Sequence, residues 1–322
     1  MATKRNAALA RHKNGNTPPS HTRTISRAEA ARAADSTGTP KGSLILVGGG
    51  EDRQDEMHIL REVAGRAKGG RLAVITAAST QPEEMWALYK KLFHQLGVKD
   101  VVHVPVADRD AAFDPAVVDT LKSAKVIFFS GGDQVRITSR LGGSTLCDAI
   151  RKFYEGGITL AGTSAGTSCM SETMLVGGAG DESHKVGNSL LMAPGLGLMT
   201  NVIIDQHFAE RGRIGRLLGA VAQNPRILGV GIDEDTAIIV KDGRFRVFGS
   251  GAVYVIDAIS ESYTNVSEDQ ADKTMSIFDV RLHILSAGDV FDLATRRPTS
   301  AKPGSVPPEQ ARNGAAAAGA RQ

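Results

Sequence analysis

The chain has 322 residues and a formal net charge of +3, and its hydrophobic (41%) and charged (23%) fractions are those of an ordinary soluble protein. This composition excludes collagen-like, disulfide-framework and wholly disordered chains, because only Cys147 and Cys169 could pair and core-forming residues are plentiful. No window approaches the ~18 uninterrupted apolar residues of a membrane span, and no signal-peptide core is visible, so we expect a cytoplasmic protein without a membrane partner.

The positive charge is concentrated at the two ends of the chain. Residues 1–40 have a net charge of +5 in a stretch rich in Ala, Thr, Ser and Asn, and residues 296–322 have a net charge of +4 in a stretch rich in Pro and Ala. Both segments are predicted to be disordered tails. A single folded domain is then expected over residues 41–295, with a net charge of −6. An acidic core is not typical of nucleic-acid-binding proteins, so no nucleic-acid partner is expected.

Between the tails, short apolar runs first alternate with amphipathic stretches. The runs are each typical of a strand that is buried on both faces, and they cover 44–47, 72–76, 101–106, 126–129 and 158–161. The stretches have the three- and four-residue apolar spacing of helices that cover a sheet, and they cover 54–67, 82–96 and 116–121. This order predicts an α/β fold: a doubly wound, mostly parallel sheet with helices on both faces.

The pattern changes after residue 227 to closely spaced apolar runs. They cover 227–232, 237–240, 245–248, 253–256 and 280–285, and Asp242 and Gly243 form a hairpin-turn pair between two of them. We therefore expect the sheet to end in antiparallel strands toward the C-terminus.

Ligands of such folds bind beyond the carboxyl ends of the parallel strands, so the loops that follow the predicted strands are the first candidates for a site. These loops are 48–52 (GGGED), 76–80 (TAAST), 130–134 (SGGDQ) and 162–166 (GTSAG). The first lacks the full GxGxxG spacing of a dinucleotide site. The two cysteines also lack the spacing of metal ligands, and we expect neither a cofactor nor a metal ion.

Residues 162–166 match the G-x-S-x-G pattern of a nucleophile elbow. The match follows a predicted strand and precedes a predicted helix that runs through Met174. In a tight strand-to-helix turn, flanking glycines let the backbone approach closely and the serine hydroxyl stands above the sheet edge. The amide of Ala165 can then face a developing oxyanion. The pattern indicates that Ser164 is a nucleophile.

A serine nucleophile needs a base, and a histidine oriented by a carboxylate is the usual arrangement. His207 follows the apolar run 202–204, which would deliver it to the site, and His184 in a glycine-rich loop is the rival candidate. The other histidines fall in the tail, in predicted helices or inside apolar strands: His12, His21, His58, His94, His103 and His283.

Three adjacent carboxylates could orient the base: Asp233, Glu234 and Asp235 follow another strand-like run. The pattern alone does not choose among them. An acid that follows the histidine in the chain is not the order of the α/β-hydrolases, so that fold is not expected.

Arg211, Arg213 and Arg216 form a third cluster, directly after His207. A helix starting near residue 209 would put the second and third on one face. Guanidinium groups bind carboxylates bidentately, so three of them beside a nucleophile indicate carboxylate recognition. The alternative is an ordinary solvated helix face.

Together these motifs resemble the cyanophycinase family, serine peptidases related in fold to aspartyl dipeptidase and to the class I glutamine amidotransferases. The resembling segments are GGGED (48–52), GGDQ (131–134), GTSAG (162–166), DQHF (205–208) with the three arginines, and GIDEDTA (231–237). Members of the family are exopeptidases that tend to form homodimers. They hydrolyse cyanophycin, a polyaspartate whose β-carboxyls carry arginine in isopeptide linkage, to β-aspartyl-arginine dipeptides.

The resemblance implies a role for each matching residue. Ser164 would be the nucleophile, His207 the base and Glu234 the orienting acid. The oxyanion hole would consist of the amide of Ala165 and one from the Gly132–Asp133 turn, assigned to Asp133. The residues that match the family's substrate-binding positions are Gln134, Asp205, Gln206, Arg211, Arg213 and Arg216. The arginines would bind backbone carboxylates, and the acids would bind the arginine side chains of the substrate.

Two other interpretations stay open at this point. An α-aspartyl dipeptidase on the same scaffold would need no pocket for a branching arginine, and a binding protein would need no working triad. A glutamine amidotransferase would need cysteine at position 164, and the serine there excludes it.

Overall fold

The computed structural model describes residues 40–177, 190–266 and 273–299 of the chain. These residues all fall in one compact unit. Three predictions lie wholly or mostly outside the described residues: the N-terminal tail up to residue 39, most of the C-terminal tail, and the rival histidine His184. Strand β17 (Arg297–Thr299) pairs with β16 (Val290–Asp292), so regular structure continues past residue 295, the predicted end of the domain.

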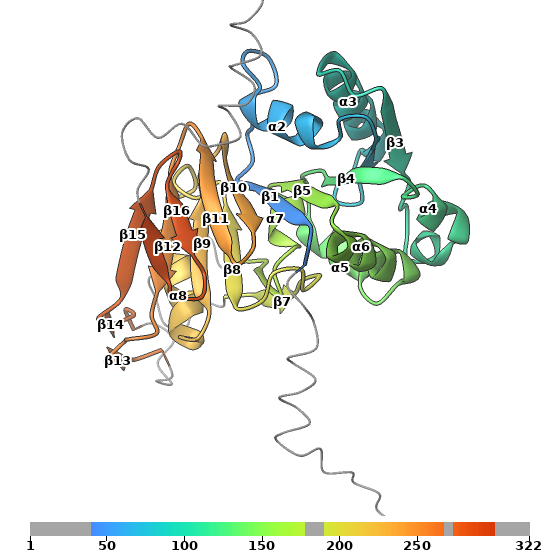
Figure 1. Cartoon of the computed structure of the whole chain (residues 1–322). Coiled ribbons are helices and arrows are strands. Elements are labelled where there is room, and N and C mark those ends of the chain that lie inside the picture. Colours follow the sequence, from blue (N-terminus) through green and yellow to red (C-terminus); the bar gives the residue numbers. More distant parts are fainter. Residues whose placement is uncertain (1–39, 178–189, 267–272, 300–322) are drawn as a thin grey trace, which may run out of the picture. The chain divides into compact units, whose positions relative to one another are not determined.

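A nine-stranded sheet crosses the molecule in the order β17-β16-β11-β10-β1-β5-β4-β2-β3 (Figure 1). Its parallel part consists of β1 (Ser43–Val47), β2 (Arg71–Ile75), β3 (Asp100–Val104), β4 (Ala124–Phe129) and β5 (Thr159–Thr163). Two further strands, β10 (Thr236–Lys241) and β11 (Arg244–Gly249), join antiparallel at the β1 side and lead to β16 and β17. The predicted mostly parallel sheet with antiparallel strands from the C-terminal part is confirmed.

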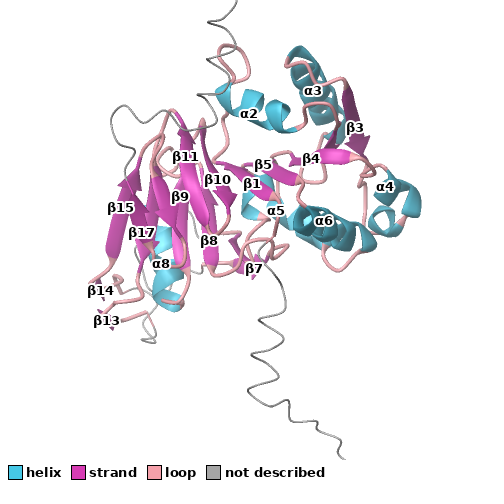
Figure 2. Cartoon of the chain, in the orientation of Figure 1, coloured by secondary structure: helices cyan, strands magenta, loops and turns pink. Residues whose placement is uncertain are grey.

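Helices cover both faces of the parallel strands (Figure 2). They are α2 (His58–Arg66), α3 (Pro82–Gln95), α4 (Pro115–Asp119), α5 (Gln134–Leu141) and α6 (Thr145–Gly156). Successive side chains of a strand point to opposite faces. In β1, Ile45 and Val47 pack in the core with α2 and α3, while Leu44 and Leu46 pack in the core with α5 and α6. This two-sided burial explains why the strands are continuous apolar runs.

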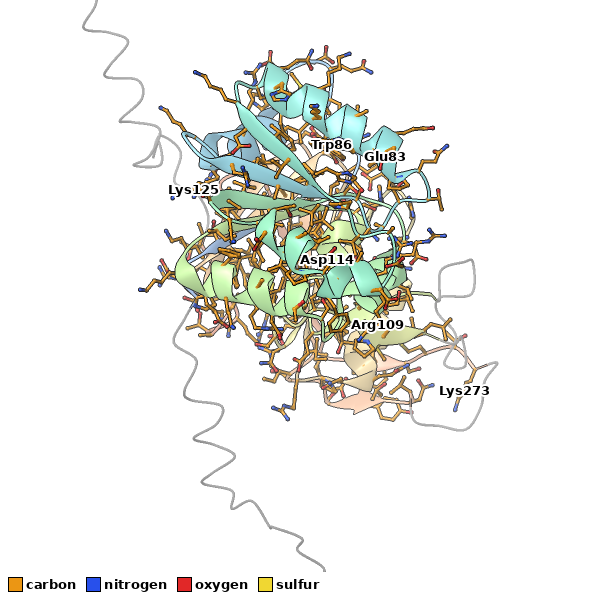
Figure 3. The ribbon with its side chains drawn as sticks, turned by 90° about the vertical axis from the view of Figure 1, so that its right-hand side faces the viewer. Glu83, Trp86, Arg109, Asp114, Lys125 and Lys273 are labelled. Carbon is orange, nitrogen blue, oxygen red and sulfur yellow. The ribbon has the colours of Figure 1, made fainter. Side chains whose placement is uncertain are left out.

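Figure 3 shows the two helix layers from the β3 side, with Glu83 and Trp86 on α3 above the strands and Asp114 before α4 below them. Trp86 stacks on His103 of β3, with 5.1 Å between ring centroids. His103 also forms a 2.8 Å hydrogen bond to the Thr76 hydroxyl. This histidine is therefore a packing residue of the sheet edge.

Two predicted helices differ from the observed ones. The helix expected over 54–67 begins at His58, because the Asp52 carboxylate accepts hydrogen bonds from three backbone amides between residues 54 and 57 and holds that segment in a turn. The helix expected through Met174 is the short α7 (Ala165–Ser168). The Ser171 hydroxyl bonds to the carbonyls of Ser168 and Thr173 at 2.8 Å each, which ends that helix, and Met174 lies in β6 (Thr173–Leu175).

A separate four-stranded sheet has the order β15-β12-β9-β8. It consists of β8 (Val202–Gln206), β9 (Leu228–Ile232), β12 (Val253–Asp257) and β15 (Arg281–Leu285). The helix α8 (Ile214–Gln223) connects the parallel pair β8 and β9 and packs on them through Leu217 and Val221. The prediction placed all late strands in one sheet, because an apolar run does not reveal which strand will be its partner.

Short two-stranded pairs complete the described part. Strand β6 pairs with β7 (Met192–Pro194), and β13 (Tyr263–Thr264) pairs with β14 (Ile277–Phe278). Within the described ranges, no helix has the length and apolar character needed to cross a membrane.

Candidate active site

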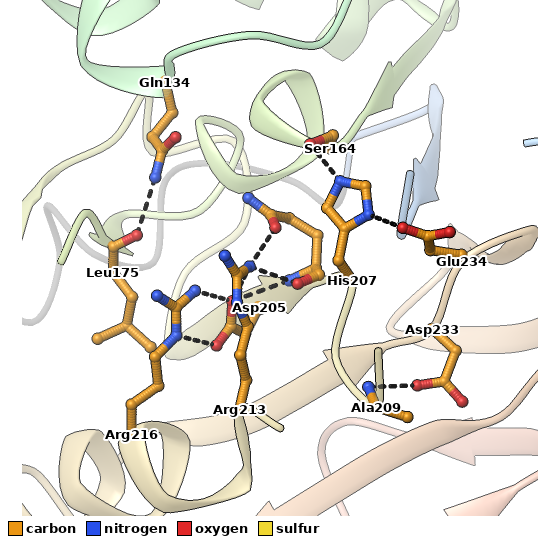
Figure 4. A network of polar contacts seen from close by, with 11 residues as sticks. Gln134, Ser164, Leu175, Asp205, His207, Ala209, Arg213, Arg216, Asp233 and Glu234 are labelled. Carbon is orange, nitrogen blue, oxygen red and sulfur yellow. Dashed lines mark hydrogen bonds and ion pairs between the residues drawn. The ribbon is translucent and has the colours of Figure 1, made fainter. Parts of the chain in front are cut away.

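Three loops that follow strands bring three polar side chains together (Figure 4). Ser164 follows β5, His207 follows β8 and Glu234 follows β9. The first strand belongs to the large sheet and the other two to the small sheet. The site is therefore built where the carboxyl ends of parallel strands from both sheets meet.

Ser164 lies in a strained turn between β5 and α7, with φ 53° and ψ −113°. A β-carbon at Gly162 would collide with the carbonyl oxygen of Gly166, and one at Gly166 would collide with that of Phe129. Both glycines are thus required by close backbone approach, and they give the G-x-S-x-G spacing a physical cause.

Hydrogen bonds connect the three side chains in a row. The Ser164 hydroxyl oxygen lies 2.9 Å from Nε2 of His207, and Nδ1 of His207 lies 2.5 Å from Oε1 of Glu234. The imidazole is buried, and 42% of the Glu234 side chain is exposed. In this geometry the carboxylate holds the proton on Nδ1, which leaves Nε2 as a base for the hydroxyl.

The acids on either side of Glu234 have other partners. Asp233 accepts hydrogen bonds from the amides of Ala209 (2.9 Å) and Ala252 (3.1 Å). Asp235 accepts hydrogen bonds from the amide of Asp52 (2.9 Å) and the hydroxyl of Ser250 (2.8 Å). Of the three candidate acids, Glu234 is therefore the one that contacts the imidazole.

The glycine loop 48–52 supports the row from one side. The amide of His207 donates to the carbonyl of Gly48 at 2.8 Å, and the amide of Asp235 donates to the carbonyl of Gly49 at 2.9 Å. A β-carbon at Gly50 would lie 2.7 Å from Oε2 of Glu234, so this loop can approach the triad only without side chains. From its position after the first predicted strand, the sequence placed this loop among the candidates for the site, but it did not reveal that the loop contacts the base and acid loops.

A buried ionic cluster lies beside the row. Nε of Arg216 donates to Asp205 at 2.6 Å and its Nη2 donates to the other carboxylate oxygen. Nη1 of Arg213 donates to the same carboxylate at 3.1 Å, to the carbonyl of Gln206 at 2.5 Å and to the Gln206 side-chain oxygen. Asp205 is 1% exposed. Burial lowers the pKa of Arg213 to about 10, against the opposing effect of Asp205, and the nearby Arg216 and Arg211 lower it further.

The loop that contains Gly131 and Gly132 reaches the nucleophile from the other side. A β-carbon at Gly131 would lie 3.5 Å from Cβ of Ser164. Gln134 begins α5, and its side-chain amide donates to the carbonyl of Leu175 at 2.9 Å. Within the described part of the chain, no group of three or more His, Cys, Asp or Glu side chains could hold a metal ion.

Comparison with known proteins places this geometry in a family. Residues 44–248 match the model of Peptidase family S51, which is well over half of the chain. The chain belongs to peptidase family S51. It is therefore an enzyme of the peptidase class, and the matched range contains all three residues of the row.

Named relatives agree with this family. A cyanophycinase from Synechococcus elongatus is 39% identical over 262 residues, which cover 80% of this chain and 81% of that protein. A cyanophycinase from a Nostoc species is 38% identical over 261 residues, with coverage of 80% and 87%. The crystal structure of a peptidase from an acI-B1 Actinobacterium has the same fold, with a TM-score of 0.60 at 22% identity over 80% of this chain and 98% of that one.

Two predictions about site residues differ from the structure: the second oxyanion donor and the role of the arginines. The amide of Asp133 donates to the carbonyl of Ala78 at 3.0 Å, so it is not available for an oxyanion. Gly132 has φ +141° and packs against Ala78, so this turn is held on the Ala78 loop. The Asp133 carboxylate accepts a hydrogen bond from the amide of Val135 in α5. The assignment of the second oxyanion donor to Asp133 is therefore wrong.

The second departure concerns the arginines. Helix α8 begins at Ile214 and not near residue 209, and Arg213 and Arg216 turn inward to Asp205. Arg216 is 4% exposed and uses both ends of its guanidinium fork on this carboxylate, so it does not bind a substrate carboxylate in this arrangement. The solvated-face alternative also fails for both of these arginines. Arg211 is the exposed member of the three.

Proposed function

We propose that this S51 peptidase hydrolyses cyanophycin to β-aspartyl-arginine dipeptides through an acyl-enzyme on Ser164. The observation that carries the proposal is the row of hydrogen bonds from Ser164 through His207 to Glu234. The choice of substrate is supported by relatives named cyanophycinase at 37–39% identity over 80% of the chain.

The geometry supports a two-step mechanism. The Ser164 oxygen attacks the scissile carbonyl carbon while Nε2 of His207 accepts the hydroxyl proton. Glu234 keeps the imidazole in the correct tautomer and stabilises the imidazolium that forms. The imidazolium then protonates the leaving amine, and the peptide C–N bond breaks. A water molecule, deprotonated by the same imidazole, attacks the acyl-enzyme and releases the product together with the regenerated serine.

We assign the oxyanion contacts to backbone amides on the two sides of Ser164. One is the amide of Ala165, as expected from the elbow. The other is the amide of Gly132, which replaces that of Asp133 because the latter is engaged with Ala78. Fixed amide donors of this kind stabilise the charge that develops on the carbonyl oxygen.

Substrate recognition is assigned to polar side chains around the row. Cyanophycin offers a carboxylate and a guanidinium on each repeat. Arg211 is exposed and suits the carboxylate, and Gln134 is a partly exposed polar group beside the row (Figure 4). Asp205 and Gln206 are buried and bonded to Arg213, so they support the site from within. Arg213 and Arg216 act by holding the Asp205 carboxylate in place.

Two alternatives are less well supported. A Peptidase E from a Nostoc species is 24% identical over 57% of this chain, which is weaker than the match to the cyanophycinases and favours the activity of the latter. An α-aspartyl dipeptidase would also not need the family's substrate-binding segment around Asp205 and Arg211. A non-catalytic binding protein would not need the hydrogen bonds that connect Ser164, His207 and Glu234, so their presence disfavours this alternative.

The cytoplasmic location and the homodimeric state are further proposals. The location is inferred from the sequence, and the homodimer from its resemblance to the family. Light scattering on the purified protein measures the mass in solution, and a monomeric mass at micromolar concentration would contradict the homodimer.

The decisive experiment incubates the purified protein with insoluble cyanophycin and identifies the soluble products by mass. β-Aspartyl-arginine is the expected product. The Ser164→Ala variant serves as the control for contaminating hydrolases, and α-aspartyl dipeptides serve as the competing substrate. Turnover of those dipeptides with no release from cyanophycin would reject the proposal.

A further inference from the structure

Glu51 is a buried carboxylate for which the mechanism above has no use. It follows the three glycines of the 48–52 loop, and its side chain is 0% exposed. Its oxygen Oε2 accepts a 2.5 Å hydrogen bond from the hydroxyl of Thr163. The other oxygen accepts hydrogen bonds from the Tyr89 hydroxyl (2.7 Å) and from Nη2 of Arg53 (2.8 Å).

This environment is costly to build for packing alone. A buried carboxylate is unfavourable unless charged or polar partners compensate both oxygens, and an apolar residue fills space without that requirement. Burial and the nearby Glu51 carboxylate raise the pKa of Tyr89, which keeps its hydroxyl protonated as a donor. The arrangement therefore presents a fixed acceptor, Oε2, to Thr163.

Thr163 is the last residue of β5 and directly precedes Ser164. The elbow has other attachments to the end of β1. The amide of Ser164 donates to the carbonyl of Val47 at 3.0 Å, and the hydroxyl of Thr167 donates to the same carbonyl at 2.7 Å. The bond from Thr163 to Glu51 adds a side-chain attachment at the residue directly before Ser164.

We propose that Glu51 is a positioning residue for the reaction, which acts through Thr163 to fix the strained backbone at Ser164. The Ser164 hydroxyl then stays within hydrogen-bond distance of the imidazole. Together with the contacts of Gly48 and Gly49 to the base and acid loops, this makes the 48–52 loop a support for all three members of the row. The inference rests on the proposed function in one respect, namely that Ser164 is the nucleophile.

The test uses two substitutions of threonine by valine in the same strand. Thr163→Val removes the hydroxyl that donates to Glu51 and keeps the branched shape. Thr159→Val is the matched control, because the Thr159 hydroxyl is also buried and pairs with Ser43 of β1 at 3.0 Å, at the opposite end of β5. Thr163→Ser is the conservative variant, because it keeps a hydroxyl that can donate to Glu51.

The readouts are the rate at which a fluorophosphonate phosphonylates Ser164 with loss of fluoride, kcat and KM on cyanophycin, and Tm. We expect Thr163→Val to lower the phosphonylation rate and kcat by roughly 10- to 100-fold with KM within about twofold, since a small displacement of a reacting group has effects of this size. Thr163→Ser should retain most of the wild-type rate. Thr159→Val should lower Tm comparably and react with the fluorophosphonate at close to the wild-type rate.

Glu51→Gln tests the carboxylate directly, and the threonine variants decide the matter if this variant does not fold. Phosphonylation of Thr163→Val at the wild-type rate, or an equal loss in Thr159→Val, would overturn the positioning role. A wild-type protein that reacts with the fluorophosphonate and yet leaves cyanophycin intact would reject the substrate alone. A wild-type protein that does not react with the fluorophosphonate would overturn both, because Ser164 would then not be an activated nucleophile.

Discussion

The α-carbon of Gly49 lies directly against the imidazole of His207. A β-carbon at this position would come within 2.5 Å of Nε2, the ring nitrogen that faces the Ser164 hydroxyl. Gly49 also has φ +100°, a backbone conformation that residues with a side chain rarely adopt. The imidazole of His207 can therefore occupy its position only because residue 49 has no side chain.

Gly49→Ala should therefore displace the imidazole and lower the rate at which Ser164 reacts with a fluorophosphonate by about 100-fold or more. The matched control is Gly97→Ala, because Gly97 has a similar φ of +88° and an added β-carbon there would meet no atom within 4 Å. Both variants should lose stability by roughly 1–2 kcal/mol from the left-handed backbone, and only the first should lose reactivity. Fluorophosphonate labelling and thermal unfolding separate the two effects, and equal labelling of both variants would contradict the role of Gly49.

Replacement of the nucleophile gives the strongest expected effect. Ser164→Ala should reduce turnover by several orders of magnitude, to the residual ~10³–10⁴-fold acceleration over water that binding and oxyanion contacts supply. Folding should be unaffected, because the hydroxyl contributes one partly buried hydrogen bond. Product release from cyanophycin and the unfolding curve are the measurements. A variant with substantial turnover would mean that the acyl-enzyme forms elsewhere.

The three adjacent acids should respond differently to removal of their charge. Glu234→Gln should lower kcat by ~10⁴-fold with little change in affinity, because the amide no longer holds the productive tautomer of His207. Asp233→Asn should instead lower stability by about 1 kcal/mol, since it accepts backbone amides from Ala209 and Ala252. Steady-state kinetics and denaturant unfolding of both variants test this. A larger loss of kcat in Asp233→Asn would contradict the assignment of the orienting acid.

The three positions of the row were predictable because each follows a local signal, whereas the choice of Glu234 among three adjacent acids came from the resemblance to the family. The apolar runs before Ser164, His207 and Glu234 indicate strands, and the ends of such strands in an α/β sheet gather at one edge. The G-x-S-x-G spacing also has a local cause, the close approach of Gly162 and Gly166 to neighbouring backbone.

The remaining features depend on partners that are distant in the sequence. Nothing near Asp133 indicates that its amide would bond to Ala78, and nothing near Arg216 indicates that Asp205 would draw it inward. The helices α5 and α6 were also not predicted. Their N-terminal caps, Asp133 and Ser144, were the local signals that could have revealed them.

The two cysteines should differ in reactivity. Cys169 is 0% exposed, and burial raises the pKa of its thiol well above the usual range. Cys147 is half-buried, and burial also raises its pKa. A raised thiol pKa leaves less thiolate at pH 8, so in a disulfide-exchange assay Cys147 should react slowly and Cys169 only after unfolding in guanidinium. Rapid reaction of two equivalents in the native protein would contradict the burial of Cys169.

The three arginines after His207 should differ in role. We expect Arg211 to bind substrate and Arg213 and Arg216 to stabilise the folded protein. Arg216→Ala should lower the free energy of unfolding by roughly 3–5 kcal/mol, because it leaves the Asp205 carboxylate buried with one cation fewer. Arg216→Lys should recover only part of this, since an ammonium cannot make the two-pronged contact. Denaturant unfolding measures both changes.

Arg211→Ala should show the opposite behaviour. Arg211 is exposed, so its removal should change the free energy of unfolding by no more than about 0.5 kcal/mol. A charge-assisted contact to a substrate carboxylate contributes ~1.5–3 kcal/mol, so kcat/KM on cyanophycin should fall by roughly 10- to 100-fold. The rate of Ser164 phosphonylation by a small fluorophosphonate should stay near the wild-type value, because that reagent has no carboxylate to bind. Wild-type kcat/KM in Arg211→Ala would mean that other side chains recognise the substrate carboxylates, whereas a parallel loss of phosphonylation would mean that Arg211 supports the base rather than the substrate.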